Sequence, residues 1–328
     1  MRKILQNCSP SLRDALNGAG IKTVASLMCC DADVLAKKGN IDREELQVLQ
    51  KSVRLQFSSL PVCGSDFLDT ITSTFCILST GCDNWDELLD GGLYSGEITE
   101  LVGAAGSGKT QACMSIASSV TLNLEKNALY IDTGGAFSSQ RVQEIICEKD
   151  ASLSEQDSIA SLSRLRCVQA FDVFSVLDCV ETTKRHINQE DDPFYQDLRL
   201  IIVDSVAAII TPILGGQQIS GHTMMVHLAR QLKSLAVDYA LSILITNNVV
   251  SDSSVAGSVK PALGQTWAHF PNTRVFLQKN LAHSMVNQAH RASKERIATV
   301  TKSSRQPLQI STTFYIGSAG IMSLPVSR

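Results

Sequence analysis

The sequence has no apolar run that approaches the roughly 18 to 20 residues needed for a membrane-spanning helix. Its first residues, MRKILQNCSPSLRDAL, also lack the uninterrupted apolar segment of a secretory signal. These two absences argue against a membrane protein and against a secreted one. We therefore expect a protein of the cytosol or the nucleus.

The sequence also lacks the spacings that mark metal and acyl-transfer sites. Its ten cysteines include no C-x-x-C pair, so neither a disulfide framework nor a zinc site is supported. The histidines show no H-E-x-x-H spacing, and no serine lies in a G-x-S-x-G turn. Metal sites built on cysteine or histidine, and acyl-transfer chemistry, therefore have no support in the sequence.

Charge is unevenly distributed along the 328 residues, although the formal net charge is only −3. Residues 253–328 contain nine Lys or Arg and one acid, Glu295, a balance of +8 that leaves −11 for residues 1–252. A basic C-terminal quarter suits a surface that meets phosphate or an acidic neighbour, and it also suits an ordinary solvated face. With 44% hydrophobic and 19% charged residues, the chain is typical of a globular protein with one large core and a small additional domain.

Residues 1–57 have the pattern of a small all-helical domain. Ser9 is a candidate N-cap, Pro10 fits the first helical position, and Gly18 fits a helix end. The later run DREELQVLQKSVRLQF repeats apolar residues at helical spacing. The segment LNGAGIKTVASL weakly resembles a helix-hairpin-helix, whose glycine turn offers backbone N–H groups to phosphate. This domain is therefore a candidate contact for DNA or for a partner.

We interpret residues 58–75 as a linker, because Pro61, Gly64 and several serines interrupt any sustained periodicity. Beyond the linker, residues 76–328 alternate short apolar runs with helical stretches. The runs include EITELVG, NALYID, LRLIIVD and ALSILITN. Near-continuous apolar strands require helices on both faces of a mostly parallel, twisted sheet. The sequence therefore predicts an α/β fold for residues 76–328.

The motif GAAGSGKT, Gly103–Thr110, matches G-x-x-x-x-G-K-[ST] and lies between an apolar strand and a helix, as a P-loop must. The glycines let backbone N–H groups wrap a phosphate, while the lysine and the hydroxyl serve the terminal phosphates and Mg²⁺. Asp204, at the end of LRLIIVD, has the position of a carboxylate that holds Mg²⁺ through water. We therefore predict a site for ATP and Mg²⁺. Its nucleotide-binding residues are Gly103, Ala104, Ala105, Gly106, Ser107, Gly108, Lys109, Thr110 and Gln111, and its magnesium ligands are Thr110 and Asp204.

Several segments together resemble the eukaryotic RecA-like recombinases and, in detail, their D-type paralogue. They are GGLYSGEITELVG, GSGKTQ, ALYIDTGGAF, LIIVDS, LGGQQ, ILITNNVV and KSSRQP. The resemblance implies a RecA-like P-loop NTPase core. It also implies a nuclear, ATP-binding subunit of a hetero-oligomer with other recombinase paralogues, the C-type and the small XRCC-type. Such a complex helps the recombinase to load on single-stranded DNA in homologous recombination repair.

The resemblance also assigns roles at three further positions of the nucleotide site. Arg141 corresponds to the arginine that faces adenine, and Asn248 replaces the glutamine of the family's polar sensor. Gly134 replaces the glutamate that activates water, and Asp132 does not substitute, because the recombinases carry that aspartate as well. General-base catalysis contributes roughly 10²- to 10⁴-fold to a rate. We therefore predict that the chain binds ATP and hydrolyses it only weakly.

Two loops occupy the places that the family uses for DNA. TPILGGQQISGH is rich in glycine and amides, and VVSDSSVAGSVKPALGQTWAHF mixes a cation with aromatic residues. Single-stranded DNA is held by aromatic stacking and by neutralisation of phosphate charge. The candidate contacts are Lys260, Trp267, His269 and Phe270, although Trp267 and Phe270 could equally anchor the loop to the core.

The resemblance further places three residues at subunit interfaces. Lys302 and Arg305 lie in KSSRQP, the segment that the family presents to a neighbour's nucleotide, or they form an ordinary basic turn. Phe67 in SDFLDTIT is the nearest match to the phenylalanine that docks on the next subunit from an extended segment. Thr70 stands where the family has alanine. The alternative is that Phe67 packs on its own core.

Two other functions are compatible with some of these motifs. One is an autonomous DNA-dependent ATPase, either a filament-forming strand-exchange recombinase or a relative of hexameric helicases. Gly134 and the lack of a clear F-x-x-A motif argue against it. The other is a scaffold with a vestigial P-loop, against which the intact Lys109, Thr110 and Asp204 argue.

Overall fold

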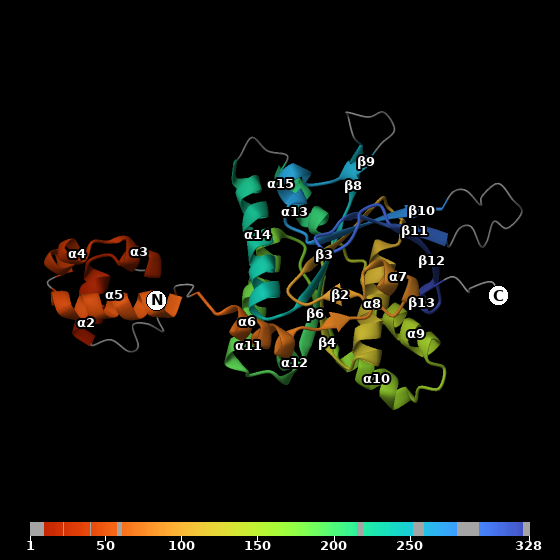
Figure 1. Cartoon of the computed structure of the whole chain (residues 1–328), viewed down its shortest axis with the longest axis horizontal. Helices are drawn as coiled ribbons and strands as arrows, with labels where there is room; N and C mark the ends of the chain where they lie inside the picture. The colour runs from red at the N-terminus through yellow and green to blue at the C-terminus, as the bar shows by residue number, and fades with distance from the viewer. Residues whose placement is uncertain are drawn as a thin grey trace, which may run out of the picture. The chain divides into compact units, whose positions relative to one another are not determined.

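The computed structural model describes residues 10–21, 23–39, 41–57, 61–214, 219–251, 259–280 and 295–323. The chain divides into two compact units, residues 1–71 and 72–328, and both are drawn in Figure 1. Each unit buries a hydrophobic core of its own. None of the described helices combines the length and the apolar character that crossing a membrane requires.

The smaller unit is built from short helices around a single core. The helices of its first 57 residues are α2 (Pro10–Gly18), α3 (Val24–Cys29), α4 (Ala32–Gly39) and α5 (Arg43–Phe57). Leu16, Leu27 and Leu46 are fully buried between them. At the start of α3, the hydroxyl of Thr23 accepts a hydrogen bond from the amide of Ser26 at 3.0 Å, which satisfies one of the free N–H groups of the first turn.

The expectation of an extended chain around Phe67 is wrong, because Gly64–Thr74 forms the helix α6. The amide of Phe67 donates to the carbonyl oxygen of Cys63 at 2.9 Å. Phe67 is 57% exposed and Leu68 is 63% exposed, so the alternative in which Phe67 packs on its own core is also wrong. Serine and threonine are weak helix formers, and their frequency in this segment hides the helix from sequence analysis.

The larger unit has an α/β fold around a nine-stranded sheet with the order β13-β12-β11-β10-β3-β7-β6-β4-β5. The strands from β10 to β5 in this order are parallel, whereas β11, β12 and β13 continue the sheet in antiparallel pairs. The strands are β3 (Ile98–Gly103), β4 (Asn127–Asp132), β5 (Leu165–Gln169), β6 (Leu198–Asp204), β7 (Ser242–Asn247), β10 (Thr273–Lys279), β11 (Glu295–Lys302), β12 (Ser311–Gly317) and β13 (Gly320–Ser323). Two short antiparallel pairs lie outside it, β1 (Ile77–Leu78) with β2 (Leu93–Tyr94) and β8 (Val249–Ser251) with β9 (Val259–Pro261).

Helices cover both faces of this sheet, as the apolar runs predict (Figure 1). Alternation along β4 shows the two faces, because Tyr130 lies in one core and Ile131 in the other. The first core is covered by α7 (Asp83–Leu88), α8 (Lys109–Asn123), α9 (Ser139–Lys149) and α10 (Glu155–Ser163). The second is covered by α11 (Val173–Gln189), α12 (Pro193–Gln196), α13 (Val206–Leu214), α14 (Ile219–Asp238) and α15 (Gly264–Ala268). The carboxyl ends of the parallel strands meet at one edge, where ligands of open α/β sheets bind.

Candidate nucleotide-binding site

The predicted P-loop connects β3 to α8 at this edge. Gly106 and Gly108 have φ values of 72° and 105°, which side chains disfavour. A Cβ atom at Gly103 would lie 2.4 Å from Oγ of Ser107 and 2.6 Å from the carbonyl oxygen of Leu277, so only glycine fits there. The loop borders a cavity of about 430 Å³, whose described lining residues are Gly106, Gly108, Lys109, Thr110, Gln111, Arg296 and Ile316.

Lys109 opens α8 with its ammonium group folded over the loop. Nζ donates to the carbonyl oxygens of Gly103 at 2.6 Å and Ala104 at 3.2 Å. Burial lowers the pKa of Lys109, and the nearby carboxylate of Asp204 partly offsets that effect. A phosphate oxygen is a stronger acceptor for this ammonium than a neutral carbonyl, because the resulting bond is between opposite charges. The lysine is therefore positioned to exchange loop carbonyls for phosphate.

Asp204 is held at the end of β6 by two hydroxyl donors. The Tyr130 hydroxyl donates to Oδ2 at 2.8 Å, and Oγ1 of Thr246 donates to Oδ1 at 2.5 Å. Burial raises the pKa of Tyr130 far above its usual value, so the phenol stays protonated and remains a donor. The carboxylate is 6% exposed and is fixed in orientation. A carboxylate here and the Thr110 hydroxyl at the start of α8 are the hard oxygen donors that suit Mg²⁺.

The turn after β4 leaves no carboxylate for water activation. Oδ1 of Asp132 accepts hydrogen bonds from the amides of Gly134, Gly135 and Ala136 at 2.9 to 3.2 Å. Its Oδ2 accepts from the amide of Phe137 at 3.1 Å. Asp132 is 1% exposed, so its acceptor capacity is used to build the turn. The interpretation that it does not replace the missing glutamate therefore has a physical reason.

Arg141 is not among the described residues that line the cavity, but it contacts one of them, Gln111. Its Nε donates to Oε1 of Gln111 at 3.0 Å, and Nη1 donates to the carbonyl oxygen of Ser318 at 2.9 Å. Nη2 donates to the carbonyl oxygen of Gly317, in the turn between β12 and β13. The predicted adenine-facing arginine and Gln111 are thus adjacent. Asn248 is exposed and is not among the described residues that line the cavity.

Two cations that sequence analysis did not assign to the site lie beside the loop. Nη2 of Arg296 donates to the carbonyl oxygen of Gly106 at 3.3 Å. Nζ of Lys279 would be 3.2 Å from a Cβ atom built on Gly106. The only signal in the sequence was the basic balance of residues 253–328, which does not say which cations lie beside the loop.

Comparison with known proteins identifies the family. The family model described as Rad51 matches residues 72–323. This chain belongs to the Rad51 family. "DNA repair protein RAD51 homolog 4" of Bos taurus is 37% identical over 305 residues, which cover 93% of this chain and 91% of that protein. "Probable DNA repair protein RAD51 homolog 4" of Dictyostelium discoideum is 29% identical over 325 residues, 89% of each chain. "DNA repair protein RAD51" of Saccharomyces cerevisiae is 31% identical over 261 residues, 75% of this chain and 62% of that protein.

The family confirms the RecA-like core that the motifs indicate, and it confirms the kinship with recombinase paralogues. In this Rad51-family chain the P-loop and the strand-end aspartate lie together at the carboxyl ends of the parallel strands, where ligands of open α/β sheets bind.

Trp267 lies in the core of this Rad51-family chain, so the prediction that it stacks on DNA bases is wrong. Its indole is 1% exposed and donates to Oε1 of Glu100 at 2.8 Å. Glu100 also accepts from Nδ2 of Asn247 at 2.8 Å and from Nε of Arg274 at 2.5 Å. Phe270 is partly buried against the same core, with its ring centroid 6.0 Å from that of Trp267. The aromatic residues anchor the segment after β9, which was the alternative interpretation.

Lys260 and His269 are the exposed members of the predicted DNA surface. Lys260 lies on β9 and is paired with Val250 of β8, and His269 follows α15. Parts of both predicted DNA loops, residues 215–218 and 252–258, lie outside the described residues. Contact with DNA therefore stays a prediction that rests on two side chains rather than four.

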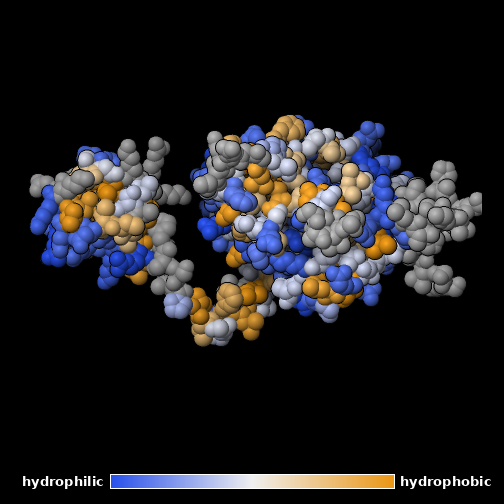
Figure 2. All heavy atoms as spheres, turned by 90° about the horizontal axis from the view of Figure 1, so that it is seen from above, coloured by the Kyte–Doolittle hydropathy of each residue, from blue (hydrophilic) through white to orange (hydrophobic). Residues whose placement is uncertain are grey.

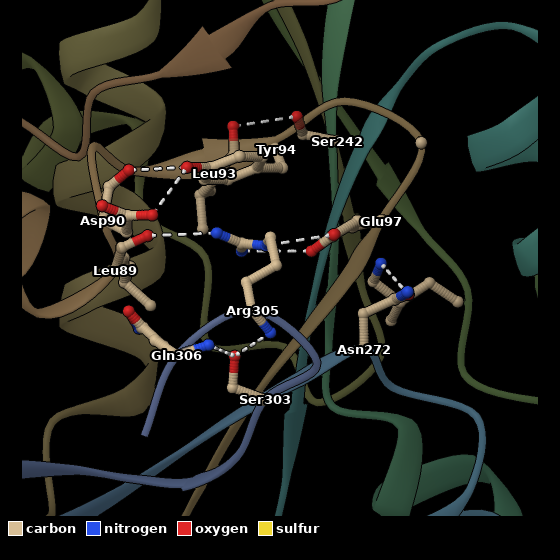
Figure 3. Close-up of polar contacts among 12 residues, drawn as sticks. Leu89, Asp90, Leu93, Tyr94, Glu97, Ser242, Asn272, Ser303, Arg305 and Gln306 are labelled. Atoms are coloured by element: carbon tan, nitrogen blue, oxygen red, sulfur yellow. Dashed lines mark hydrogen bonds and ion pairs between the residues drawn. The ribbon is translucent and has the colours of Figure 1, made fainter. Parts of the chain in front are cut away.

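Arg305 is committed to its own chain, contrary to the expectation that it reaches a neighbour's nucleotide. Its Nε and Nη2 atoms each donate to Glu97 at 3.2 Å, and its guanidinium carbon lies 3.3 Å from the ring centroid of Tyr94 (Figure 3). The two charged side chains are 19% and 17% exposed. This ion pair holds the segment after β11 against the start of β3, so it is more than an ordinary basic turn.

Lys302, at the end of β11, also bonds to its own chain. Its Nζ donates to the carbonyl oxygens of Ala268 at 2.8 Å, His269 at 3.0 Å and Pro271 at 2.6 Å. Three bonds use the full donor capacity of an ammonium group. In this chain the lysine therefore caps the end of α15, and a phosphate contact from Lys302 stays a prediction.

We expect Arg305→Ala to lower the free energy of unfolding by about 1 to 3 kcal/mol, because Glu97 would be left without its charged donor. Chemical denaturation of the full chain measures the loss. Lys126→Ala, which removes an exposed ion pair with Asp197, is a control expected to change stability by less than about 1 kcal/mol. If the Arg305 variant is as stable as the wild type but assembles more weakly with a partner, the original expectation that Arg305 lies at the subunit interface would be supported.

Proposed function

We propose that this chain is the ATP-binding, D-type subunit of a hetero-oligomeric complex of Rad51 paralogues. In that complex it assists the loading of the recombinase on single-stranded DNA during homologous recombination repair in the nucleus. The relatives named "RAD51 homolog 4" support the D-type assignment, and their names place those proteins in DNA repair. The C-type and small XRCC-type paralogues are the proposed partners.

The observation that carries the proposal is a complete set of P-loop residues beside the end of β4, where no carboxylate is available to activate water. Lys109 and Thr110 supply the charge and the hydroxyl for ATP and Mg²⁺, and Asp204 is buried and oriented nearby. Bound Mg²⁺ would neutralise phosphate charge. At Gly134 no side chain orients water, and Asp132 is saturated by amide donors. Such a site binds a nucleoside triphosphate and hydrolyses it slowly.

A retained nucleotide can stabilise an assembly. If ATP binds between this subunit and its neighbour, a hundredfold excess over the dissociation constant adds about 2.7 kcal/mol to the bound state. Slow hydrolysis prolongs that contribution. We therefore propose that the nucleotide acts as a clamp between paralogues rather than as a fuel.

The test measures MgATP binding and turnover of the full chain, with and without single-stranded DNA, and its co-purification with the C-type and small XRCC-type paralogues in the presence and absence of ATP. We expect binding, slow turnover that DNA does not stimulate, and assembly that ATP strengthens. A DNA-stimulated turnover equal to that of a strand-exchange recombinase would instead support the autonomous, filament-forming ATPase.

Phe67 is proposed as a partner contact on the exposed apolar surface of α6. Phe67 and Leu68 are exposed there, and hydrophobic side chains gather along this segment in Figure 2. Exposed apolar groups in a cluster mark interaction sites in soluble proteins. The helix presents the phenylalanine without needing the extended conformation that the family motif implies.

We expect Phe67→Ala to lower the affinity for one partner paralogue about tenfold or more, because truncating an aromatic anchor at an interface typically costs about 2 kcal/mol. Thermal stability and MgATP affinity of the isolated chain should hardly change, since the side chain is mostly exposed. Val48→Ala is the control, because Val48 is 68% exposed on α5. A phenylalanine variant that melts several degrees lower and binds its partners normally would contradict the assignment.

A further inference from the structure

Lys279 and Arg296 face each other across the antiparallel pair of β10 and β11. Residues directly opposite in such a pair have side chains on the same side of the sheet, so the two cations are neighbours. Like charges at directly opposite positions destabilise a strand pair.

Both cations also converge on the middle of the P-loop. Arg296 donates to the carbonyl oxygen of Gly106 at 3.3 Å, and the ammonium of Lys279 lies 3.2 Å from where a side chain at Gly106 would begin. Glycine at this position therefore leaves the space into which the lysine reaches. The strand pair brings positive charge to the loop from the side opposite β7 and Asp204.

The cavity at the loop has the electrostatic character of a polyanion site. Lys109 and Arg296 are among its described lining residues, and those residues include no carboxylate. Arg296 is partly buried, and burial lowers the pKa of its guanidinium, which shows that the surroundings disfavour the charge. A group of negative charges in the cavity would remove this cost and the repulsion between the two strands together.

We propose that Arg296 and Lys279 bind the phosphate chain of the nucleotide held by the P-loop of the same chain. A guanidinium group can donate to two phosphate oxygens at once, and an ammonium group adds a compact charge beside it. With Lys109, three cations of one chain surround the phosphates. This inference rests on the proposed ATP-binding function and names further residues that retain the nucleotide.

The first experiment measures the dissociation constants of MgATP and MgADP for the full chain. Arg296→Ala is expected to weaken both about tenfold or more, since a charged, bidentate phosphate contact is lost, and Arg296→Lys should restore part of the affinity. Lys279→Ala should weaken binding severalfold. Lys126→Ala is the matched control, because Lys126 lies before the amino end of β4, at the edge of the parallel strands opposite the P-loop, and its variant should bind like the wild type.

The second measurement is the melting temperature with and without MgATP. Without nucleotide, Arg296→Ala should melt close to the temperature of the wild type, because the relief of cross-strand repulsion offsets the loss of its bonds to the carbonyl oxygens of Glu295 and Gly106. Its stabilisation by MgATP should be smaller than that of the wild type. A purely structural arginine would give the opposite pattern, with a lower melting temperature and an undiminished shift.

The outcomes separate this inference from the function on which it rests. If the wild type binds MgATP and the Arg296→Ala variant binds it within about twofold, a factor too small for a lost charged contact, the inference is overturned and the ATP site stands. If the wild type and Lys126→Ala bind no nucleotide, the proposed function is wrong and the inference is overturned with it. Weaker binding by both Arg296→Ala and Lys279→Ala, with normal folding, supports the inference.

Discussion

Lys109→Ala is expected to lower the affinity of the isolated chain for MgATP by about 100-fold or more, equivalent to about 2.7 kcal/mol. Lys109 is the first residue of α8, which lines the cavity. The bonds from its ammonium group to loop carbonyls are available for exchange with phosphate. Removing it leaves the backbone amides of the loop without the charge that complements the terminal phosphates. Equilibrium titration with a fluorescent ATP analogue, confirmed by calorimetry, measures the change.

Lys109→Arg is the matched variant, because it keeps the charge but places it on a longer, planar group. We expect it to retain part of the binding. A melting curve of each variant without nucleotide controls for folding, since Lys109 also bonds to Gly103 and Ala104. If ATP clamps the complex, Lys109→Ala should also weaken assembly with the partner paralogue. Loss of ATP binding with unchanged partner affinity would leave the nucleotide no role at that interface.

Gly134→Glu is expected to raise the turnover of ATP by about 10²-fold, the lower range for general-base catalysis. The position accepts a side chain, because a Cβ atom at Gly134 would meet nothing within 4 Å and the residue has no left-handed φ. A glutamate there would extend from the turn that Asp132 already holds in shape. Release of inorganic phosphate under single-turnover and steady-state conditions measures the gain.

Gly134→Gln is the control for shape, because it has the size of glutamate but is not a base. Its turnover should remain that of the wild type, and both variants should keep their affinity for MgATP within about threefold, since neither adds nor removes a phosphate contact. Wild-type turnover already as fast as that of the glutamate variant would show that another carboxylate activates water. Equal gains in both variants would point to an effect of side-chain volume.

The candidate nucleotide site could be predicted from the sequence because its main parts are local. Gly103 to Thr110 are contiguous, so their order alone places a lysine and a hydroxyl at the start of a helix that follows a buried strand. Asp204 could be predicted from the apolar run that precedes it, because strand ends of a parallel sheet share one edge. Gly134 followed from family resemblance, and the space around it only from the structure.

The helix α6 was missed for a local reason as well. Its Gly64 and its threonines and serines are weak helix formers, and an isolated helix of this length is marginal in water. Contacts made in the folded chain override such propensities, and these contacts cannot be deduced from the local sequence. The sequence left open whether Phe67 contacts a partner or packs on its own core, since burial depends on what packs against the helix, and the structure shows the side chain exposed.

By itself the sequence determined the α/β fold and the phosphate loop, because each of these depends on neighbouring residues or on a periodic pattern, whereas the missing base at residue 134 followed from the resemblance to the recombinases. Only the tertiary structure decided which cations lie beside the P-loop. Arg305 meets Glu97, 208 positions away, whereas Arg296 meets Gly106, 190 positions away. A cation binds the acceptor that folding brings within about 3 Å, and pairings over such separations have no signature in the order of the residues.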